Sequence, residues 1–303
     1  MAVQINYTEF NSILLKLRTE YKIFAPVKLK GIGKSSKNDI IRYCEINDAK
    51  DIIFDEKSDF SPKEVYFPIT QTLSYALNND ESLLEIDDKN YIIFMRPCDI
   101  NAISIFNNLC SKDKQNGIFN DRLRKKIKIF MIECKEGFDT CFCVSMGMNK
   151  TDYYDMAFRF SSENILCEIK SEEFAVYFGG IGEQVNFTPV FVSKDRMTVH
   201  VPDVSEISNE MKDTSDWTEF LKRDGSWAEY TKRCISCGRC NFVCHTCVCF
   251  RVQDITYNDE GTVREKRRVW ESCMKEGYSN NTGSQFYRRS SGDRMLFKVF
   301  HKI

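Results

Sequence analysis

The sequence Cys234-Ile-Ser-Cys237-Gly-Arg-Cys240-Asn-Phe-Val-Cys244 follows the spacing C-x2-C-x2-C-x3-C. Bacterial ferredoxins use this spacing to hold a [4Fe–4S] cluster. The short spacers let three thiolates, here Cys234, Cys237 and Cys240, surround one cluster, while its fourth ligand comes from elsewhere. In two-cluster ferredoxins the fourth cysteine of the run binds the other cluster, so we expect Cys244 to bind the same cluster or a neighbouring one. The run therefore predicts one or more [4Fe–4S] clusters.

Residues around this run fit a cluster but also have simpler explanations. Gly238 permits a tight backbone turn close to inorganic sulfide. His245 stands where ferredoxin runs usually place proline. We interpret it as a surface residue or a support for a ligand, and a ligand or proton donor is the alternative. The basic side chains nearby either offset the negative charge of a cluster or form a solvated face: Lys232, Arg233, Arg239 and Arg251.

Structural zinc is the main alternative for this run, because zinc also takes four cysteines. Zinc modules usually pair C-x2-C with a distant second pair, whereas here three cysteines recur at a period of three. Three further cysteines follow at Cys247, Cys249 and Cys273. A zinc-binding interaction or nucleic-acid module is therefore the rival class, motivated also by a basic set: Arg264, Lys266, Arg267, Arg268, Arg288 and Arg289. The cluster interpretation predicts no nucleic-acid partner.

A second group of cysteines lies in the N-terminal part of the sequence. Cys98 follows an expected strand at the start of an expected helix, and Cys134 follows another expected strand. Two adjacent strands would bring both thiols to one edge of a sheet, where Cys141 and Cys143 on the next loop could join them. The alternatives are a second metal site and four separate buried thiols. Three other cysteines are expected in the core: Cys44, Cys110 and Cys167.

Composition and charge narrow the class of protein. The 303 residues are 42% hydrophobic and 29% charged, as in an ordinary soluble protein, and 14 cysteines stand against 3 histidines. Without a leader pattern or an apolar run of about 18 residues, we expect a cytoplasmic protein with no membrane partner. Cytosolic disulfides are rare, so the cysteines indicate metal binding or redox work. Residues 231–303 hold 14 Lys and Arg against 7 Asp and Glu, so the C-terminal part is basic and the remainder acidic.

The periodicity of apolar residues predicts an α+β protein: an N-terminal mixed α/β domain at residues 1–225 and a ferredoxin-like iron–sulfur module at residues 226–303. A polar linker is expected at residues 203–216. Helices are expected at residues 7–21, 69–77, 99–109 and 217–230. Strands are expected at residues 40–46, 51–54, 91–95, 127–132, 158–160, 190–192 and 197–201.

Several short motifs together resemble the iron–sulfur subunit of anaerobic sulfite reductase and the related beta subunit of sulfhydrogenases. They are Arg96-Pro-Cys-Asp99, Cys141-Phe-Cys143, the run ending in Cys247-Val-Cys249-Phe250, and Trp270-Glu-Ser-Cys273. Residues 294–303 resemble the family's approach to a second C-x2-C-x2-C-x3-C run. Because that run does not follow, we expect a module truncated before it, or a single cluster completed by Cys247, Cys249 or Cys273.

The resemblance implies a function and partners. In the sulfite reductases of the family, the iron–sulfur subunit relays electrons from a flavin subunit that oxidises a nicotinamide cofactor to a sirohaem subunit that reduces sulfite to sulfide. It implies the same role here, with a hydrogenase partner as the alternative. The glycines near residues 31–35 and 180–185 complete neither a P-loop nor a dinucleotide-binding motif. We therefore expect an electron-transfer subunit of an oxidoreductase complex that is not catalytic alone.

Overall fold

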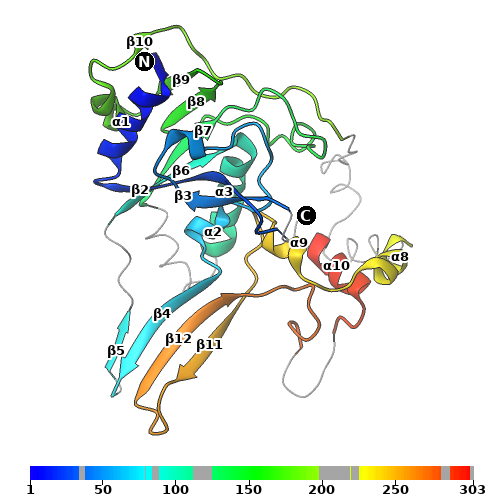
Figure 1. Cartoon of the computed structure of the whole chain (residues 1–303). Helices are drawn as coiled ribbons and strands as arrows, with labels where there is room; N and C mark the ends of the chain where they lie inside the picture. The colour runs from blue at the N-terminus through cyan, green and yellow to red at the C-terminus, as the bar shows by residue number, and fades with distance from the viewer. Residues whose placement is uncertain are drawn as a thin grey trace. The chain divides into compact units, whose positions relative to one another are not determined.

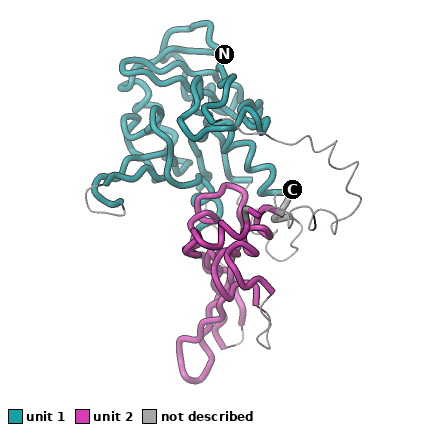
Figure 2. Tube along the Cα trace, turned by 90° about the vertical axis from the view of Figure 1, so that its right-hand side faces the viewer, with its two compact units in different colours: residues 1–68, 85–199 teal, residues 69–84, 200–303 magenta. Residues whose placement is uncertain are grey.

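A computed structural model describes residues 1–33, 38–78, 80–83, 89–111, 125–197, 219, 225–280 and 287–300. The chain divides into two compact units, one of residues 1–68 and 85–199 and one of residues 69–84 and 200–303 (Figure 2). The second unit therefore takes a short segment from early in the sequence. The linker expected at residues 203–216 lies outside the described residues, and the predicted domain limits at 225 and 226 stay a prediction.

The first unit is built on an eight-stranded mixed sheet in the order β10-β1-β9-β8-β7-β6-β2-β3 (Figure 1). Strands β2, β6, β7 and β8 are parallel neighbours, and the outer pairs are antiparallel. The strands are β1 (Ala2–Asn6), β2 (Tyr21–Leu29), β3 (Ile40–Glu45), β6 (Asn90–Met95), β7 (Ile127–Ile132), β8 (Met156–Phe160), β9 (Asn164–Ile169) and β10 (Glu183–Gln184). The helices are α1 (Tyr7–Leu17), α2 (Lys63–Tyr66), α3 (Pro97–Ser111), α5 (Glu172–Ala175) and the 3-10 turns η1 (Ala49–Asp51) and η2 (Val176–Phe178).

Helix α1 packs its apolar face on this sheet. It begins with a capping box, in which Asn6 accepts from the Glu9 N–H and Glu9 accepts from the Asn6 N–H. Phe10 on its buried face packs against Phe158 with ring centroids 5.3 Å apart. Phe94 contacts Phe158 at the same separation. Removing one such ring by substitution to alanine typically costs about 3–5 kcal/mol.

The second unit contains a four-stranded antiparallel sheet in the order β11-β12-β4-β5. Its strands are β4 (Thr70–Leu77), β5 (Asp80–Leu83), β11 (Phe250–Thr256) and β12 (Val263–Trp270), and its helices are α8 (Ser226–Arg233), α9 (Arg239–Phe242) and α10 (Ser291–Phe300). Among the described residues, no helix is long and apolar enough to cross a membrane.

Most expected elements are confirmed, with four differences. The strand expected at residues 190–192 is wrong, because only Phe191 forms an isolated bridge, with Cys134. The strand expected at residues 197–201 lies almost entirely outside the described residues, and of the helix expected at residues 217–230 the structure describes α8.

The helix expected at residues 69–77 is wrong, because this segment is strand β4. Ile69, Leu73 and Leu77 share one face of a helix but also one face of a strand, since four is a multiple of the strand period of two. The strand expected at residues 51–54 is wrong as well, since this stretch follows the turn η1 without strand pairing. The expected first helix ends at Leu17, and Tyr21 already begins β2.

Candidate metal centre

The cysteine run begins where helix α8 ends. Cys234 follows the last helical residue in an extended conformation. Ser236 and Gly238 then adopt positive φ angles of 55° and 76°. The backbone therefore forms tight turns between Cys234 and the start of α9. The N–H of Ser236 points at Cys234 Sγ, 3.4 Å away. The turns direct a backbone hydrogen-bond donor toward a cysteine sulfur, and hydrogen bonds of this kind influence the potential of a cluster.

Gly238 also lets the run approach the loop that carries Cys273. A Cβ atom at Gly238 would lie 2.9 Å from the Cβ of Ser272, closer than real side chains come. Ser272 is itself fully buried, and its hydroxyl accepts from the Met274 N–H at 3.1 Å. Both the positive φ and the close approach therefore require glycine at this position.

The β11–β12 hairpin brings together two cysteines that lie far apart in the sequence. Cys249 immediately precedes β11, and Cys273 comes shortly after β12. The ladder continues past the strands, since the Glu271 N–H donates to the Cys249 carbonyl at 3.0 Å. As a result the two thiols form a hydrogen bond with each other.

Asn241 on helix α9 organises this thiol pair from the run itself. Its side chain is 2% exposed, and its amide nitrogen lies 3.3 Å from Cys249 Sγ and 3.2 Å from Cys273 Sγ. Its amide oxygen accepts a hydrogen bond from Lys298 Nζ at 3.0 Å. Asn241 thus connects two sulfurs and one cation in the interior of the unit.

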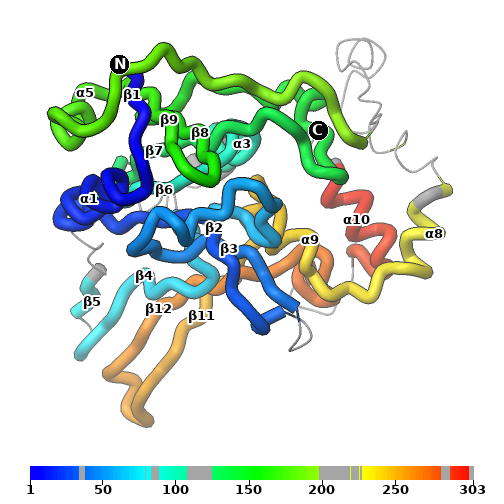
Figure 3. Tube along the Cα trace, turned by 45° about the horizontal axis from the view of Figure 1, so that its top comes forward, coloured from blue at the N-terminus to red at the C-terminus, as the bar shows by residue number. Residues whose placement is uncertain are grey.

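Helix α10 supplies two basic side chains to the cysteine loops. Lys298 donates to Cys247 Sγ at 3.2 Å and to the Cys240 carbonyl at 3.1 Å. One turn earlier, the buried Arg294 donates to Ser236 Oγ at 2.8 Å and to the Met274 carbonyl at 3.0 Å. The helix is held against α8, where the Gly292 N–H donates to Thr231 Oγ1 (Figure 3).

These contacts change the acidity of the groups involved. The hydrogen bond from Cys249 keeps the pKa of Cys273 below its ordinary value despite burial, and Asn241 and Lys298 act in the same direction. Burial raises the pKa of Cys240, and Lys298 opposes this. Burial alone would lower the pKa of Lys298, but the charge and hydrogen bond of Cys247 raise it. Metals bind cysteine as the thiolate, and these contacts favour that form of Cys273.

The cysteines predicted from the C-terminal sequence form two neighbouring groups. Charge interactions connect Cys240 with Cys234 and Cys237, of which Cys237 is exposed. Cys247 interacts with Cys273, the partner of Cys249. Cys244 is half-buried and interacts electrostatically with Lys298. Lys298 also interacts with Cys240 of the first group and with Cys247 of the second. His245 is half-buried, and its interpretation as a surface residue or a support for a ligand, with a ligand or proton donor as the alternative, stays a prediction.

The donor set fits an iron–sulfur cluster. Among the described residues, no three His, Cys, Asp or Glu side chains are arranged to hold a single metal ion. A [4Fe–4S] cluster binds each cysteine through a different iron, so its ligands surround a space instead of meeting at one point. The cysteine loops supply several thiols, of which Cys234 accepts a backbone N–H and Cys247 accepts a hydrogen bond from Lys298. Potentials of such clusters respond to hydrogen bonds on sulfur and to local charge.

The structure also locates the other cysteines. Cys98, Cys134, Cys141 and Cys143 are all half-buried in the first unit. Of the cysteines expected in the core, Cys167 is fully buried on β9, which confirms its expectation, whereas Cys44 on β3 is only half-buried. The side chain of Cys110 lies outside the described residues.

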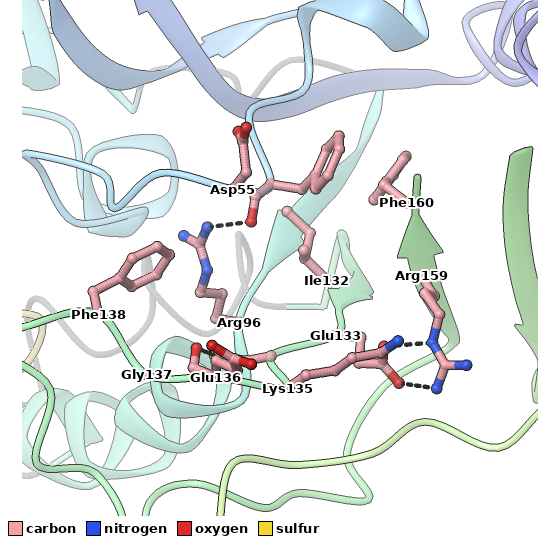
Figure 4. Close-up of a pocket in the computed structure, with 12 residues that line it drawn as sticks. Asp55, Arg96, Ile132, Glu133, Lys135, Glu136, Gly137, Phe138, Arg159 and Phe160 are labelled. Atoms are coloured by element: carbon pink, nitrogen blue, oxygen red, sulfur yellow. Dashed lines mark hydrogen bonds and ion pairs between the residues drawn. The ribbon is translucent and has the colours of Figure 1, made fainter. Parts of the chain in front are cut away.

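A cavity of about 410 Å³ lies in the first unit at the carboxyl ends of β6, β7 and β8 (Figure 4). Its charged groups are largely paired: Arg159 binds Glu133 through two hydrogen bonds of 2.6 Å. Arg96 reaches across to the Phe54 carbonyl at 3.0 Å. Cys134 is among the lining residues, so the cavity borders one of the N-terminal thiols.

Sequence reasoning missed Asn241, Arg294 and Lys298. Arg294 and Lys298 are four residues apart and therefore share a helix face, which the sequence could have indicated. Their targets depend on α10 packing beside the cysteine loops, which no local pattern encodes. Asn241 lies inside the run, where the cysteine spacing alone marks it only as a spacer.

Comparison with known proteins identifies the C-terminal part. Residues 233–303 match the 4Fe–4S dicluster domain. The sulfhydrogenase 2 subunit beta of Pyrococcus furiosus is 22% identical over 298 residues, which cover 95% of this chain and 87% of the relative. The C-terminal module is therefore a 4Fe–4S dicluster domain, its cofactors are 4Fe–4S clusters, and the zinc alternative is not supported. The chain is an iron–sulfur electron-transfer protein.

Proposed function

We propose that this chain is the electron-transfer subunit of a hydrogenase complex of the sulfhydrogenase type. The observation that carries the proposal is similarity along nearly the whole length of a sulfhydrogenase beta subunit, including the N-terminal part that precedes the dicluster domain. The site supplies cysteines, a cation and buried donors, which suit a one-electron carrier. Hydrogen chemistry itself would belong to a partner subunit.

Within the dicluster domain, we assign the ligands to two neighbouring sites. Cys234, Cys237 and Cys240 serve one cluster, because charge interactions connect these three thiols. Cys247, Cys249 and Cys273 serve the other, because Asn241 and Lys298 hold them together. Cys244 joins the second group, in agreement with the exchange of the fourth cysteine in two-cluster ferredoxins.

A bound 4Fe–4S cluster accepts and releases single electrons, and the residues around the two sites set how readily it does so. Lys298 brings a positive charge next to Cys247 Sγ and the Cys240 carbonyl. This charge favours the reduced state of a bound cluster, which is the more negative one. Phe242 and Trp270 stack with centroids 6.1 Å apart and shield this side of α9 from water. Because the cluster site is screened from water, its solvation changes little when the cluster gains or loses an electron.

The proposal is tested by isolating the complex that contains this chain and measuring hydrogen-dependent and sulfite-dependent reactions with a viologen dye. We expect hydrogen-dependent reduction of the dye, and we expect Cys240→Ser to abolish electron delivery to a downstream acceptor while hydrogen oxidation by the partner persists. A complex without hydrogen-dependent activity contradicts the proposal.

A sulfite reductase complex is the second candidate. It rests on the motif combination around residues 96–99, 141–143 and 270–273, which resembles the iron–sulfur subunit of anaerobic sulfite reductase. Its partners would be a flavin-containing reductase subunit and a sirohaem subunit. Sulfite-dependent oxidation of the reduced dye by the same complex, with no hydrogen-dependent activity, would favour this candidate over the first.

A further inference from the structure

Four cysteines of the first unit come from three separate elements that converge at one edge of its sheet. Cys98 is the second residue of α3, which begins directly after β6. Cys134 follows the adjacent parallel strand β7, so both thiols lie at the carboxyl ends of neighbouring strands. Cys141 and Cys143 lie on the loop that leaves this edge. The expected adjacency of the two strands is thereby confirmed.

The loop carrying Cys141 and Cys143 is fixed by the segment around Asp195. The Asp195 carboxylate accepts from the Val144 N–H at 2.8 Å and from the Ser145 N–H at 2.7 Å. The Cys141 carbonyl accepts the backbone N–H groups of the two residues that follow Asp195, both at 3.1 Å. A loop held by its backbone on both sides keeps its two thiols in place.

Electrostatic interactions connect all four thiols into one set. Cys98 interacts with Cys134 and Cys143, and Cys134 interacts with Cys141 and Cys143. Cys143 also interacts with Cys141. Five of the six pairs are therefore close enough for their charges to be felt, as expected of ligands around one cofactor.

A buried cation stands beside this set. Arg96 is 6% exposed, and its guanidinium donates to the carbonyls of Phe54 and Glu56 at 3.0 and 2.8 Å. Its positive charge lies close enough to Cys98 and Cys134 to interact with both side chains. Its guanidinium also packs over the Phe138 ring, and both side chains line the cavity in Figure 4. The fold thus provides positive charge where several thiolates would gather.

The site also has a route of access. Cys134 and Arg96 both line the cavity at the carboxyl ends of β6 and β7. In open α/β sheets, ligands bind at this edge of the strands. Metal ions and sulfide can therefore reach Cys134 without unfolding of the sheet.

We propose that Cys98, Cys134, Cys141 and Cys143 bind a further iron–sulfur cluster in the first unit, outside the dicluster domain. Cysteine-only sets bind zinc or iron–sulfur clusters. The chain already takes up 4Fe–4S clusters in residues 233–303, so iron and sulfide are available wherever it is assembled. A cluster here extends the electron-carrying function to the N-terminal unit, whereas zinc would not.

The test uses the full chain, purified and reconstituted without oxygen. Cys134→Ser and Cys141→Ser are each expected to lower bound iron and acid-labile sulfide by about four per chain, the content of one cubane. Cys167→Ser on β9 and Cys44→Ser on β3 are matched controls from the same unit and should leave both unchanged. Unchanged iron in both test variants, or loss of zinc in place of iron, overturns the proposal.

A measurement on the unmodified protein guards against variants that fail to fold. Thiol alkylation followed by mass spectrometry should find Cys98, Cys134, Cys141 and Cys143 protected in the holoprotein and labelled after iron chelation. Cys44 should be labelled to the same extent in both states. Equal labelling of the four before and after chelation contradicts a cluster here, whatever the fate of the C-terminal clusters. Failure of the proposed hydrogenase function would leave this result unaffected.

Discussion

Lys298 is the cation that most directly touches the cysteine loops. It donates to Cys247 Sγ, to the Cys240 carbonyl and to Asn241. A charged hydrogen bond typically contributes about 1.5–3 kcal/mol. Part of this favours the reduced state of a cluster bound to Cys247, because reduction adds negative charge.

We therefore expect Lys298→Gln to lower the reduction potential of a C-terminal cluster by tens of millivolts, since a tenfold change corresponds to about 59 mV for a one-electron couple. Redox titration followed by electron paramagnetic resonance measures this shift. The exposed Lys266 on β12 provides the control, because Lys266→Gln removes the same charge from the surface. Equal potentials in the two variants would show that Lys298 does not act on the cluster.

A comparison of substitutions at Gly238 and Gly261 distinguishes the cost of backbone strain from the cost of steric contact. Both have positive φ, 76° and 70°, but a Cβ at Gly261 would meet nothing within 4 Å, whereas one at Gly238 meets Ser272. Gly261→Ala should cost about 1–2 kcal/mol for the left-handed backbone alone. Gly238→Ala should cost more and release iron faster to a chelator. Equal effects on thermal stability and iron release would contradict the close packing of the run on Ser272.

At the scale of elements, the contact between α8 and α10 positions both basic side chains. A Cβ at Gly292 would lie 2.3 Å from the Trp227 carbonyl oxygen and 2.4 Å from Thr231 Oγ1. Because the nearer atom belongs to the backbone of α8, α10 must move away from that helix. Lys298 and Arg294 move with it.

We therefore expect Gly292→Ala to lower the melting temperature and to reproduce the lower potential of Lys298→Gln. Gly225→Ala, directly before α8, is the control, since a Cβ there meets nothing within 4 Å. Calorimetry and redox titration measure both effects. A melting temperature and potential as in the control would mean that the helix contact is not needed to place Lys298.

Several elements were predictable because one local pattern dominates them. The buried parallel strands β6 and β7 are continuous apolar runs, and α1 carries apolar residues at helical spacing. Strand β4 was not predictable, because its apolar residues satisfy both periods and its pairing partner β12 lies almost two hundred residues later. Local sequence cannot report such a partner.

The candidate site was predictable in its ligands more than in its surroundings. The spacing from Cys234 to Cys244 is short and specific, so the ligand type followed directly from the sequence. The meeting of Cys249 with Cys273 depends on the β11–β12 hairpin, and the role of Lys298 depends on the packing of α10. Both arise from tertiary contacts that have no local pattern.

At the scale of the whole chain, the division into two compact units means that a substitution can remove a cluster from one unit and leave the other unit folded. Cys237→Ser removes an exposed thiol of the run and should lower the iron content of the dicluster domain severely. The first unit has its own aromatic core around Phe10 and Phe158 and should remain folded. Iron analysis and hydrogen exchange of the first unit measure the two effects. Unchanged iron would count against Cys237 as a ligand.

The place of β4 and β5 in the second sheet constrains how the protein is made. These strands end at residue 83, but β12, on which β4 pairs, begins only at residue 263. At about 5–20 residues per second, a ribosome needs roughly 10 to 40 seconds to synthesise the intervening chain. During this interval β4 and β5 await their partner while the segment between them and β12 is still emerging. The sheet adjoining the dicluster loops is therefore completed only after β12 has been synthesised, and iron delivery to a settled site must come after that point.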